Sequence, residues 1–111
     1  MFKTNCLLFL LTFLSISVLA DSVETYSNLR FKSISTHEGL SQSSVLSIAQ
    51  DAQGLVWMGT KDGLNRFDGY RFVAYKNVPN DNNSISNNEV IFLLPDKDGN
   101  LFVGTRGGGL N

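Results

Sequence analysis

Two stretches near the C-terminus carry residue types that could bind a metal ion or a phosphate group. Asp96-Lys-Asp-Gly-Asn100 supplies carboxylate and amide oxygens, which calcium prefers as ligands. In an EF-hand loop beginning at Asp96, glycine would be sixth and glutamate twelfth, whereas here glycine is fourth and Gly107 is twelfth. Gly104-Thr-Arg-Gly-Gly-Gly109 has the glycines of a phosphate-binding loop but lacks the G-K-[ST] ending. Both stretches are therefore expected to be turns between strands, and no metal or cofactor is predicted.

Two further groups of residues could belong to an enzyme or a sugar-binding site. His37 is the only histidine, and it lies near Glu38 and Ser41 in the sequence, but no nucleophile motif surrounds them. We therefore expect His37 to be a turn residue and assign no catalytic residue. Five aromatic residues could stack on sugar rings, but they are spread over successive strand candidates and are expected to pack between sheets: Trp57, Phe67, Tyr70, Phe72 and Tyr75.

The segments that carry these residues are two copies of one sequence unit. Residues 44–60 align without gaps on residues 89–105, 45 positions further along, and five of these 17 positions are identical. Both copies continue to Gly-Leu-Asn, at 63–65 and at 109–111, with one extra glycine in the second copy. A period of about 40–50 residues is typical of propellers and solenoids, whose units cannot bury their apolar faces alone.

The first copy is expected to contain four short antiparallel strands and the second copy two. The strands expected are Val45–Gln50, Leu55–Thr60, Leu64–Phe67, Tyr70–Tyr75, Val90–Leu94 and Leu101–Thr105. A further strand is expected at Leu29–Ser35, and Asp68-Gly69 is expected to form a type I′ turn. Every apolar run of the two repeated units is shorter than eight residues and ends in Gly, Pro or Asp, which argues against helices there.

The apolar pattern within the strands predicts an all-β fold of β-propeller blades. Leu55–Met58 and Val90–Leu94 are continuously apolar, whereas a sheet with one face in water alternates apolar and polar residues. Such runs indicate that both faces are covered, as in a blade between two neighbours. A propeller is favoured over a sandwich or a solenoid. The chain would supply one complete four-stranded blade and part of a second, as a fragment of a larger propeller.

The N-terminus has the pattern of a signal peptide. Lys3 supplies the positive charge, Leu7–Leu19 is an apolar run of 13 residues, and Val18-Leu19-Ala20 offers small residues for cleavage. Thirteen residues are fewer than the roughly 20 that cross a bilayer as a helix, so an anchor that remains uncleaved is the less favoured alternative. The expected organisation is a signal peptide at 1–20, a disordered lead-in at 21–28, an N-terminal strand and turn at 29–43, blade 1 at 44–76, a connecting loop at 77–88 and a partial blade 2 at 89–111.

The composition of the exported part excludes some partners. Cleavage after Ala20 removes the only cysteine, so neither a disulfide nor a metal would hold this small domain together, and further repeats must stabilise it. Cleavage also removes one of nine basic residues, which leaves eight against ten acidic residues. This balance argues against a nucleic-acid surface and gives no electrostatic reason for membrane binding.

The order of these features resembles the two-component regulator propeller repeat. The motifs that carry the resemblance are Gly39-Leu-Ser41, Asp51-Ala-Gln-Gly-Leu-Val-Trp-Met-Gly-Thr60 and Asp62-Gly-Leu-Asn-Arg-Phe-Asp-Gly69. The resemblance extends from Phe31 to Asn111, with Phe102 where the family usually has tryptophan and Gly108 as an insertion. It implies the periplasmic sensor region of a bacterial membrane receptor whose output is a histidine kinase or a diguanylate cyclase.

The resemblance also implies partners. These are an extracytoplasmic ligand, for which carbohydrate is one class, and the missing blades of the same protein. No ligand-binding residue is assigned, because a propeller site draws on several blades. The alternatives are an exported propeller hydrolase or lyase with its catalytic residues elsewhere, and a purely structural interaction module. The isolated exported chain is not expected to be a stable monomer, since it would leave blade faces and strand edges in water.

Overall fold

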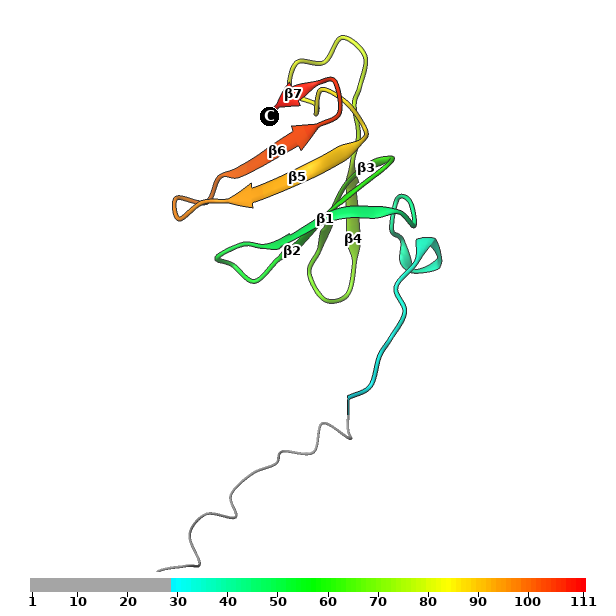
Figure 1. Ribbon diagram of the computed structural model, residues 1–111. Helices are drawn as coiled ribbons and strands as arrows, with labels where there is room; N and C mark the ends of the chain where they lie inside the picture. The colour runs from blue at the N-terminus through cyan, green and yellow to red at the C-terminus, as the bar shows by residue number, and fades with distance from the viewer. Residues whose placement is uncertain (1–28) are drawn as a thin grey trace, which may run out of the picture. The chain divides into compact units, whose positions relative to one another are not determined.

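Two antiparallel sheets form the fold of residues 33–111 (Figure 1). The computed structural model describes residues 29–111, so the signal peptide expected at 1–20 and the lead-in expected at 21–28 lie outside the described residues. The first sheet follows from one copy of the repeated sequence and the second sheet from the other. The predicted all-β class is thereby confirmed.

The first sheet is a four-stranded meander. Its strands are β1 (Val45–Gln50), β2 (Val56–Thr60), β3 (Gly63–Phe67) and β4 (Phe72–Tyr75). They pair antiparallel in the order β1-β2-β3-β4, as tight turns between short strands require. Each expected strand is present, and the largest difference in a boundary is the later start of β4.

The second sheet repeats the first three strands of this arrangement. Its strands are β5 (Val90–Pro95), β6 (Leu101–Thr105) and β7 (Gly109–Leu110), in the order β5-β6-β7. The two-residue strand β7 was not expected, and it forms because Gly109 and Leu110 pair with the end of β6. The pairing register shifts within β1 and again at the matching point of β5, so the two copies share even this irregularity.

The turn between the first two strands has the same construction in both sheets. Oδ1 of Asp51 accepts bonds from the backbone N–H groups of Gln53 (2.9 Å) and Leu55 (3.0 Å). In the second sheet, Oδ1 of Asp96 accepts the corresponding bonds from the backbone N–H groups of Asp98 (2.9 Å) and Asn100 (2.8 Å). Glycine closes each turn with a positive φ, 85° at Gly54 and 87° at Gly99, a region that L side chains avoid. The turn expected at Asp96–Asn100 is thereby confirmed.

Two local predictions were wrong. Residues 29–35 contain no strand, and only the short 3₁₀ helix η2 (Thr36–Glu38) precedes β1 in the described part of the chain. A run of β-forming residues becomes a strand only when hydrogen bonds to a neighbouring strand satisfy its backbone. The turn at 68–69 is not type I′, because Gly69 has a positive φ and Asp68 does not. Instead, Oδ1 of Asp68 accepts hydrogen bonds from the backbone N–H groups of Tyr70 and Arg71, each at 2.8 Å.

The core lies between the two sheets. Leu64 of the first sheet packs with Val90, Leu93 and Val103 of the second, and all four side chains are buried. Strand β5 lies against β1 and β2, which places the two sheets face to face. Half-buried side chains complete this cluster: Ala49, Trp57, Ile85 and Leu101. Trp57 therefore lies between the blades, as expected.

The outward face of each sheet is more open than the apolar runs suggested. Phe92 and Leu94 belong to the apolar run at Val90–Leu94 and are exposed, and so is Ile48 of β1. Phe102, which takes the place of Trp57 in the second copy, also lies on the outward face of the second sheet. Each sheet thus has one face covered by its neighbour and one face largely in water.

Candidate functional site

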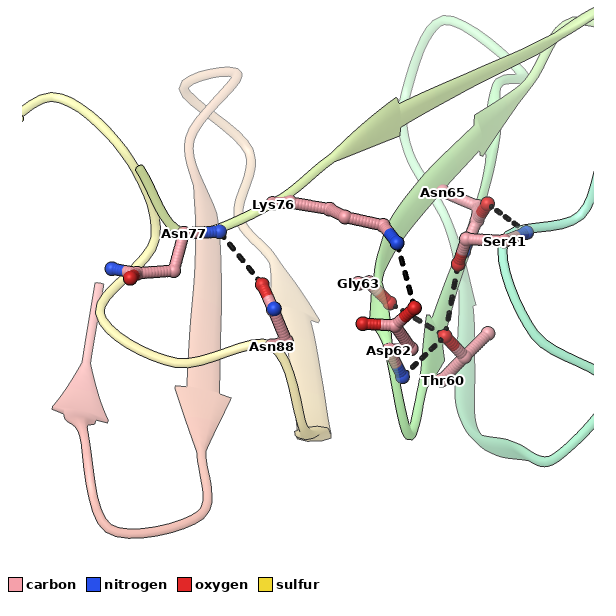
Figure 2. Close-up of polar contacts among 8 residues, drawn as sticks. All are labelled: Ser41, Thr60, Asp62, Gly63, Asn65, Lys76, Asn77 and Asn88. Atoms are coloured by element: carbon pink, nitrogen blue, oxygen red, sulfur yellow. Dashed lines mark hydrogen bonds and ion pairs between the residues drawn. The ribbon is translucent and has the colours of Figure 1, made fainter. Parts of the chain in front are cut away.

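A polar network closes one end of the first sheet (Figure 2). Oδ1 of Asn65 accepts a bond of 2.9 Å from the backbone N–H of Ser41, and Nδ2 of Asn65 donates to Oγ of Ser41 at 2.8 Å. The hydroxyl groups of Ser41 and Thr60 are 3.0 Å apart, and Thr60 donates to the carbonyl of Gly63 at 2.9 Å. Asn65 and Thr60 are fully buried, and the network ties the segment before β1 to β2 and β3.

The second sheet repeats the same network. Oδ1 of Asn111 accepts from the backbone N–H of Ser86 at 3.0 Å, and its Nδ2 donates to Oγ of Ser86 at 2.9 Å. The hydroxyl groups of Ser86 and Thr105 are 3.1 Å apart, and Thr105 donates to the carbonyl of Gly109 at 3.2 Å. Because these groups bond to one another, the network is a structural brace rather than a reactive centre. The sequence contains a sign of this network, because Ser41 and Thr60 recur 45 residues later as Ser86 and Thr105. The hydrogen bonds between Ser41 and Asn65, which are 24 positions apart, were not predicted.

A groove with a volume of about 540 Å³ lies between the two sheets. Its floor is apolar and consists of Trp57, Leu64, Leu101 and Val103. The rings of Trp57 and Tyr75 have centroids 6.0 Å apart, and Tyr75 forms part of the same wall. Because of this composition, the groove offers one large apolar surface to anything that enters it.

The rim of the groove is polar and comes from β4 and the loop at 77–88. Lys76 carries the only basic group among the lining residues, and its Nζ forms a half-exposed ion pair with Oδ2 of Asp62 at 2.6 Å (Figure 2). Asp81, Asn83 and Ser84 of the connecting loop also line the groove. A groove of this kind, with an apolar floor and a few polar groups, suits a small polar molecule that also has an apolar or flat face.

The connecting loop that supplies this rim has a defined structure. Oδ1 of Asn88 accepts from the backbone N–H of Asn77 at 2.7 Å and joins the two ends of the loop (Figure 2). Oγ of Ser84 accepts from the backbone N–H of Val78 at 2.9 Å and donates to the carbonyl of Asp81, also at 2.9 Å. These bonds hold the rim in place, so the polar side of the groove is preformed.

A second hollow, of about 390 Å³, lies between the two aspartate turns. Asp51 and Asp96 both line it, together with Arg66. The indole N–H of Trp57 and backbone N–H groups lower the pKa of the Asp51 carboxyl below its ordinary value. The side-chain amide and the backbone N–H of Asn100 lower the pKa of Asp96 in the same direction. Because both carboxylates already accept bonds within their own turns, this hollow is a less suitable site for a ligand than the groove.

The repeated geometry has a counterpart among known proteins. A family model described as two component regulator propeller matches residues 39–62 and 84–107. These segments are two-component regulator propeller repeats. Each matched segment runs from just before its first strand through its second strand, and so contains the aspartate turn. The repeats of the structure and the repeats of the family therefore coincide.

Two characterised proteins are similar to this chain in sequence or in fold. The chain is 52% identical over 77 residues to Histidine kinase P4 of Formosa agariphila, which is 69% of this chain and 5% of that protein. Its fold matches the crystal structure of the extracellular domain of a protein assigned as a hybrid two component system from B. thetaiotaomicron. That match has a TM-score of 0.65 and 38% identity, and it covers 71% of this chain and 11% of the other. The chain thus spans a small part of the length of both relatives.

The structure places the ion-binding and catalytic candidates of these propeller repeats apart from one another. Asp96–Asn100 is the turn between β5 and β6, and the glycines at 104–109 lie in β6, β7 and the turn between them. His37 lies in η2, as expected for a turn residue, and Ser41 bonds to Asn65 and Thr60. Among residues 29–111, no cluster of three or more His, Cys, Asp or Glu side chains could hold a metal ion.

The five aromatic candidates do not form one surface. Trp57 and Tyr75 face the groove, whereas Phe67 and Phe72 stack at 4.5 Å on the outward face of the first sheet. Tyr70 is 92% exposed at the turn before β4, so its expected packing between blades was wrong. It lies in the turn that Asp68 organises, beyond the reach of either sheet face.

Within the described part of the chain, no helix is long and apolar enough to cross a membrane.

Proposed function

We propose that this chain is part of the ligand-sensing, extracytoplasmic propeller of a bacterial two-component receptor. The observation that carries the proposal is the match of this chain to the two component regulator propeller model, together with its similarity to a histidine kinase and to the extracellular domain of a hybrid two component system. Catalysis would then reside in an output domain elsewhere in the receptor. The propeller would bind a ligand outside the cytoplasm, and segments beyond these repeats would transmit the signal.

The inter-sheet groove is the proposed ligand contact of this segment. Trp57 and Tyr75 would contact a flat or apolar face of the ligand, and Lys76 and Asn83 would bond to its polar groups. The two sides of the groove come from two different repeats. A ligand held there would therefore contact two blades at once and could alter how they pack. Carbohydrate remains one ligand class that fits this composition.

Ligand binding can be tested through the fluorescence of Trp57, because it is the only tryptophan in the sequence. We would titrate the chain with oligosaccharides, amino acids and nucleotides and record the tryptophan emission. A ligand of the groove shifts the emission and binds more weakly to Asn83→Ala. Asn82→Ala is the matched control, since its side chain lies on the same loop and does not line the groove. If no compound shifts the emission, or if both variants bind equally, the groove is not the ligand site.

The extracytoplasmic location is a separate part of the proposal. Alkaline phosphatase fused after Asn111 is expected to be active, because this enzyme folds only after export. Leu10→Arg interrupts the apolar run at Leu7–Leu19 and is expected to abolish the activity of the fusion. Asp21→Arg, beyond the run, is the control and is expected to have little effect. An active fusion that carries Leu10→Arg would contradict export through this segment.

A further inference from the structure

Three Asp-Gly pairs occur in the sequence, at 62–63, 68–69 and 98–99. Such a pair can cyclise, because glycine has no Cβ to hinder the attack of its backbone nitrogen on the carboxyl group of the preceding aspartate. In the sequence alone the three pairs are equivalent in this respect. In the folded chain they differ, because their carboxyl groups and their glycines have different neighbours.

The first pair is restrained on both sides of the reaction. Oδ2 of Asp62 lies 2.6 Å from Nζ of Lys76 in an ion pair, and the backbone N–H of Gly63 donates to the carbonyl of Asn88, also at 2.6 Å (Figure 2). Gly63 is buried, and a Cβ placed on it would lie 3.0 Å from the carbonyl oxygen of Tyr75. The nitrogen of Gly63 therefore reaches the carboxyl group only if these contacts break.

The second pair is exposed, but its carboxylate is bonded. Oδ1 of Asp68 accepts from the backbone N–H groups of Arg71 and Tyr70, each at 2.8 Å. These bonds lower the pKa of the Asp68 carboxyl below its ordinary value. Cyclisation expels the hydroxyl group of a protonated carboxyl, so bonds that favour the ionised form slow the reaction at this pair.

The third pair has none of these restraints. Asp98 and Gly99 are both exposed in the turn between β5 and β6, and a Cβ on Gly99 would meet no atom within 4 Å. The backbone N–H of Asp98 donates to Oδ1 of Asp96 at 2.9 Å, but among residues 29–111 no hydrogen bond or ion pair holds the Asp98 carboxylate itself. The counterpart of Asp98 in the first repeat is Gln53, so the first aspartate turn lacks the reactive pair.

From this comparison we infer that Asp98 is the site at which this fold is modified spontaneously, by conversion of the aspartate to isoaspartate through a succinimide formed with the backbone nitrogen of Gly99. The reaction is intramolecular and takes only water from outside. It depends on neither a ligand nor the proposed sensing function.

The chemistry balances without an oxidant or a reductant. The nitrogen of Gly99 forms a bond to Cγ of Asp98 and gives up its proton, and the carboxyl group loses its hydroxyl, so one water molecule leaves and a five-membered ring forms. Water then opens the ring at one of its two carbonyl carbons. Opening at Cγ restores aspartate. Opening at the other carbonyl leaves the main chain running through Cγ, with one extra methylene group in the main chain and a free α-carboxylate.

Isoaspartate at this position would disrupt the aspartate turn of the second sheet. Oδ1 of Asp96 accepts from the backbone N–H groups of Asp98 and Asn100 at 2.9 and 2.8 Å, and the N–H of Asp96 donates to the carbonyl of Asn100 at 2.9 Å. A main chain that is longer by one methylene group within residue 98 cannot keep all three bonds. The modified chain is therefore expected to have a lower thermal midpoint than the unmodified chain.

The test compares the three pairs within one protein. The full coding sequence is expressed with its own N-terminus, and the exported product is aged in mildly acidic buffer, one sample folded and one in concentrated urea. Peptide mapping against synthetic peptides that contain aspartate or isoaspartate measures each pair, and it does not depend on the oligomeric state of the chain. In urea the three pairs are expected to react at similar rates. In the folded sample, whose fold the emission of Trp57 verifies, the isoaspartate fraction at Asp98 is expected to exceed that at Asp62 and Asp68 several-fold.

Two variants test the consequence for the turn. Asp98→Glu would have to form a six-membered ring with the same nitrogen, which is slower, so its thermal midpoint is expected to stay constant during ageing while that of the unaltered chain falls. Gln53→Glu is the matched control, because it places the same side chain at the counterpart position of the first repeat and leaves Asp98 in place. Its midpoint should fall as that of the unaltered chain does.

Two results would overturn the inference. Isoaspartate that forms in the folded sample equally at the three pairs, or faster at Asp62 or Asp68, would show that the contacts of these residues do not determine the site. An equal decline of the midpoint in Asp98→Glu would show that the loss of stability during ageing has another cause.

Discussion

The indole Nε1 of Trp57 donates a hydrogen bond of 2.8 Å to Oδ2 of Asp51, which joins the middle of β2 to the turn that precedes it. The second repeat has Phe102 at this position and therefore no indole donor. There, Nδ2 of Asn100 donates to Oδ2 of Asp96, also at 2.8 Å, and Asn100 aligns with Leu55 of the first repeat. The two repeats thus satisfy the same carboxylate oxygen with different side chains.

This exchange predicts a rescue. Trp57→Phe removes the donor to Asp51 and lowers the thermal midpoint, because a carboxylate oxygen loses its partner and the groove loses part of its floor. Adding Leu55→Asn to that variant is expected to recover part of the loss, since the new amide takes the place that Asn100 has in the second repeat. Leu55→Asn alone should not raise the thermal midpoint, because the indole N–H of Trp57 already bonds to Oδ2 of Asp51.

The measurement for this prediction is a double-mutant cycle of thermal or urea unfolding. The expected result is a favourable interaction between the two substitutions. Strictly additive effects would show that the phenylalanine and the asparagine of the second repeat do not compensate for each other.

The two glycines of the second strands are expected to respond differently to alanine. Gly59→Ala places a methyl group against Val90 and the hydroxyl of Ser47, and overpacking of this kind costs about 1–3 kcal/mol of unfolding free energy. Gly104→Ala brings a methyl group to 3.1 Å from Cβ of Phe92 and to no atom of the other sheet, so a smaller loss of about 1 kcal/mol is expected. Urea unfolding of both variants measures the difference. Equal losses would contradict the close approach of the sheets at Gly59.

The polar brace should matter more in the first repeat than in the second. Asn65→Ala leaves the backbone N–H of Ser41 without its acceptor in a buried place, which costs about 1–3 kcal/mol. Asn111→Ala breaks the matching bonds in an exposed place, where water replaces them, and about 0.5 kcal/mol is expected. Comparison of the two free energies of unfolding tests this, and a larger loss for Asn111→Ala would count against the role of burial.

The aspartate turns predict a loss of stability in acid. Hydrogen bonds lower the pKa of the Asp51 and Asp96 carboxyls below the ordinary value of 3.8, so the folded state holds fewer protons than the unfolded state. Their contribution is fully present above that value and is lost as the pH falls through the lowered pKa. The thermal midpoint should therefore decrease below about pH 4.

The variant Asp51→Asn tests the assignment of this acid dependence. It has no carboxyl to protonate and retains an oxygen that can accept the backbone bonds. Its midpoint is expected to be lower than that of the unaltered chain near neutral pH and to fall less steeply in acid. An equally steep decrease in this variant would assign the acid dependence to other groups, such as Asp68 and Glu38, whose pKa values hydrogen bonds also lower.

The sequence by itself determined the repeat, the strands and the turns, because these depend on residues close together in the chain. Asp51 and Gly54 specify their turn through local hydrogen bonds and backbone freedom, and the short apolar runs specify strands. The same local information was misleading at Leu29–Ser35, because an apolar pattern does not by itself provide the paired strand that a β-strand requires. It also did not reveal that Phe102 and Leu94 would remain exposed while Trp57 is half-buried.

Only the tertiary structure decided which face of each sheet is covered and what the chain can contact there. The groove combines Trp57 of β2, Lys76 after β4 and Asn83 of the connecting loop, and no local pattern indicates that these residues meet. Ser41 and Asn65 likewise lie 24 positions apart and become partners only when the segment before β1 crosses the end of β3. Burial, and with it every role that depends on a neighbour, is a property of packing between units, which the pattern within one unit does not contain.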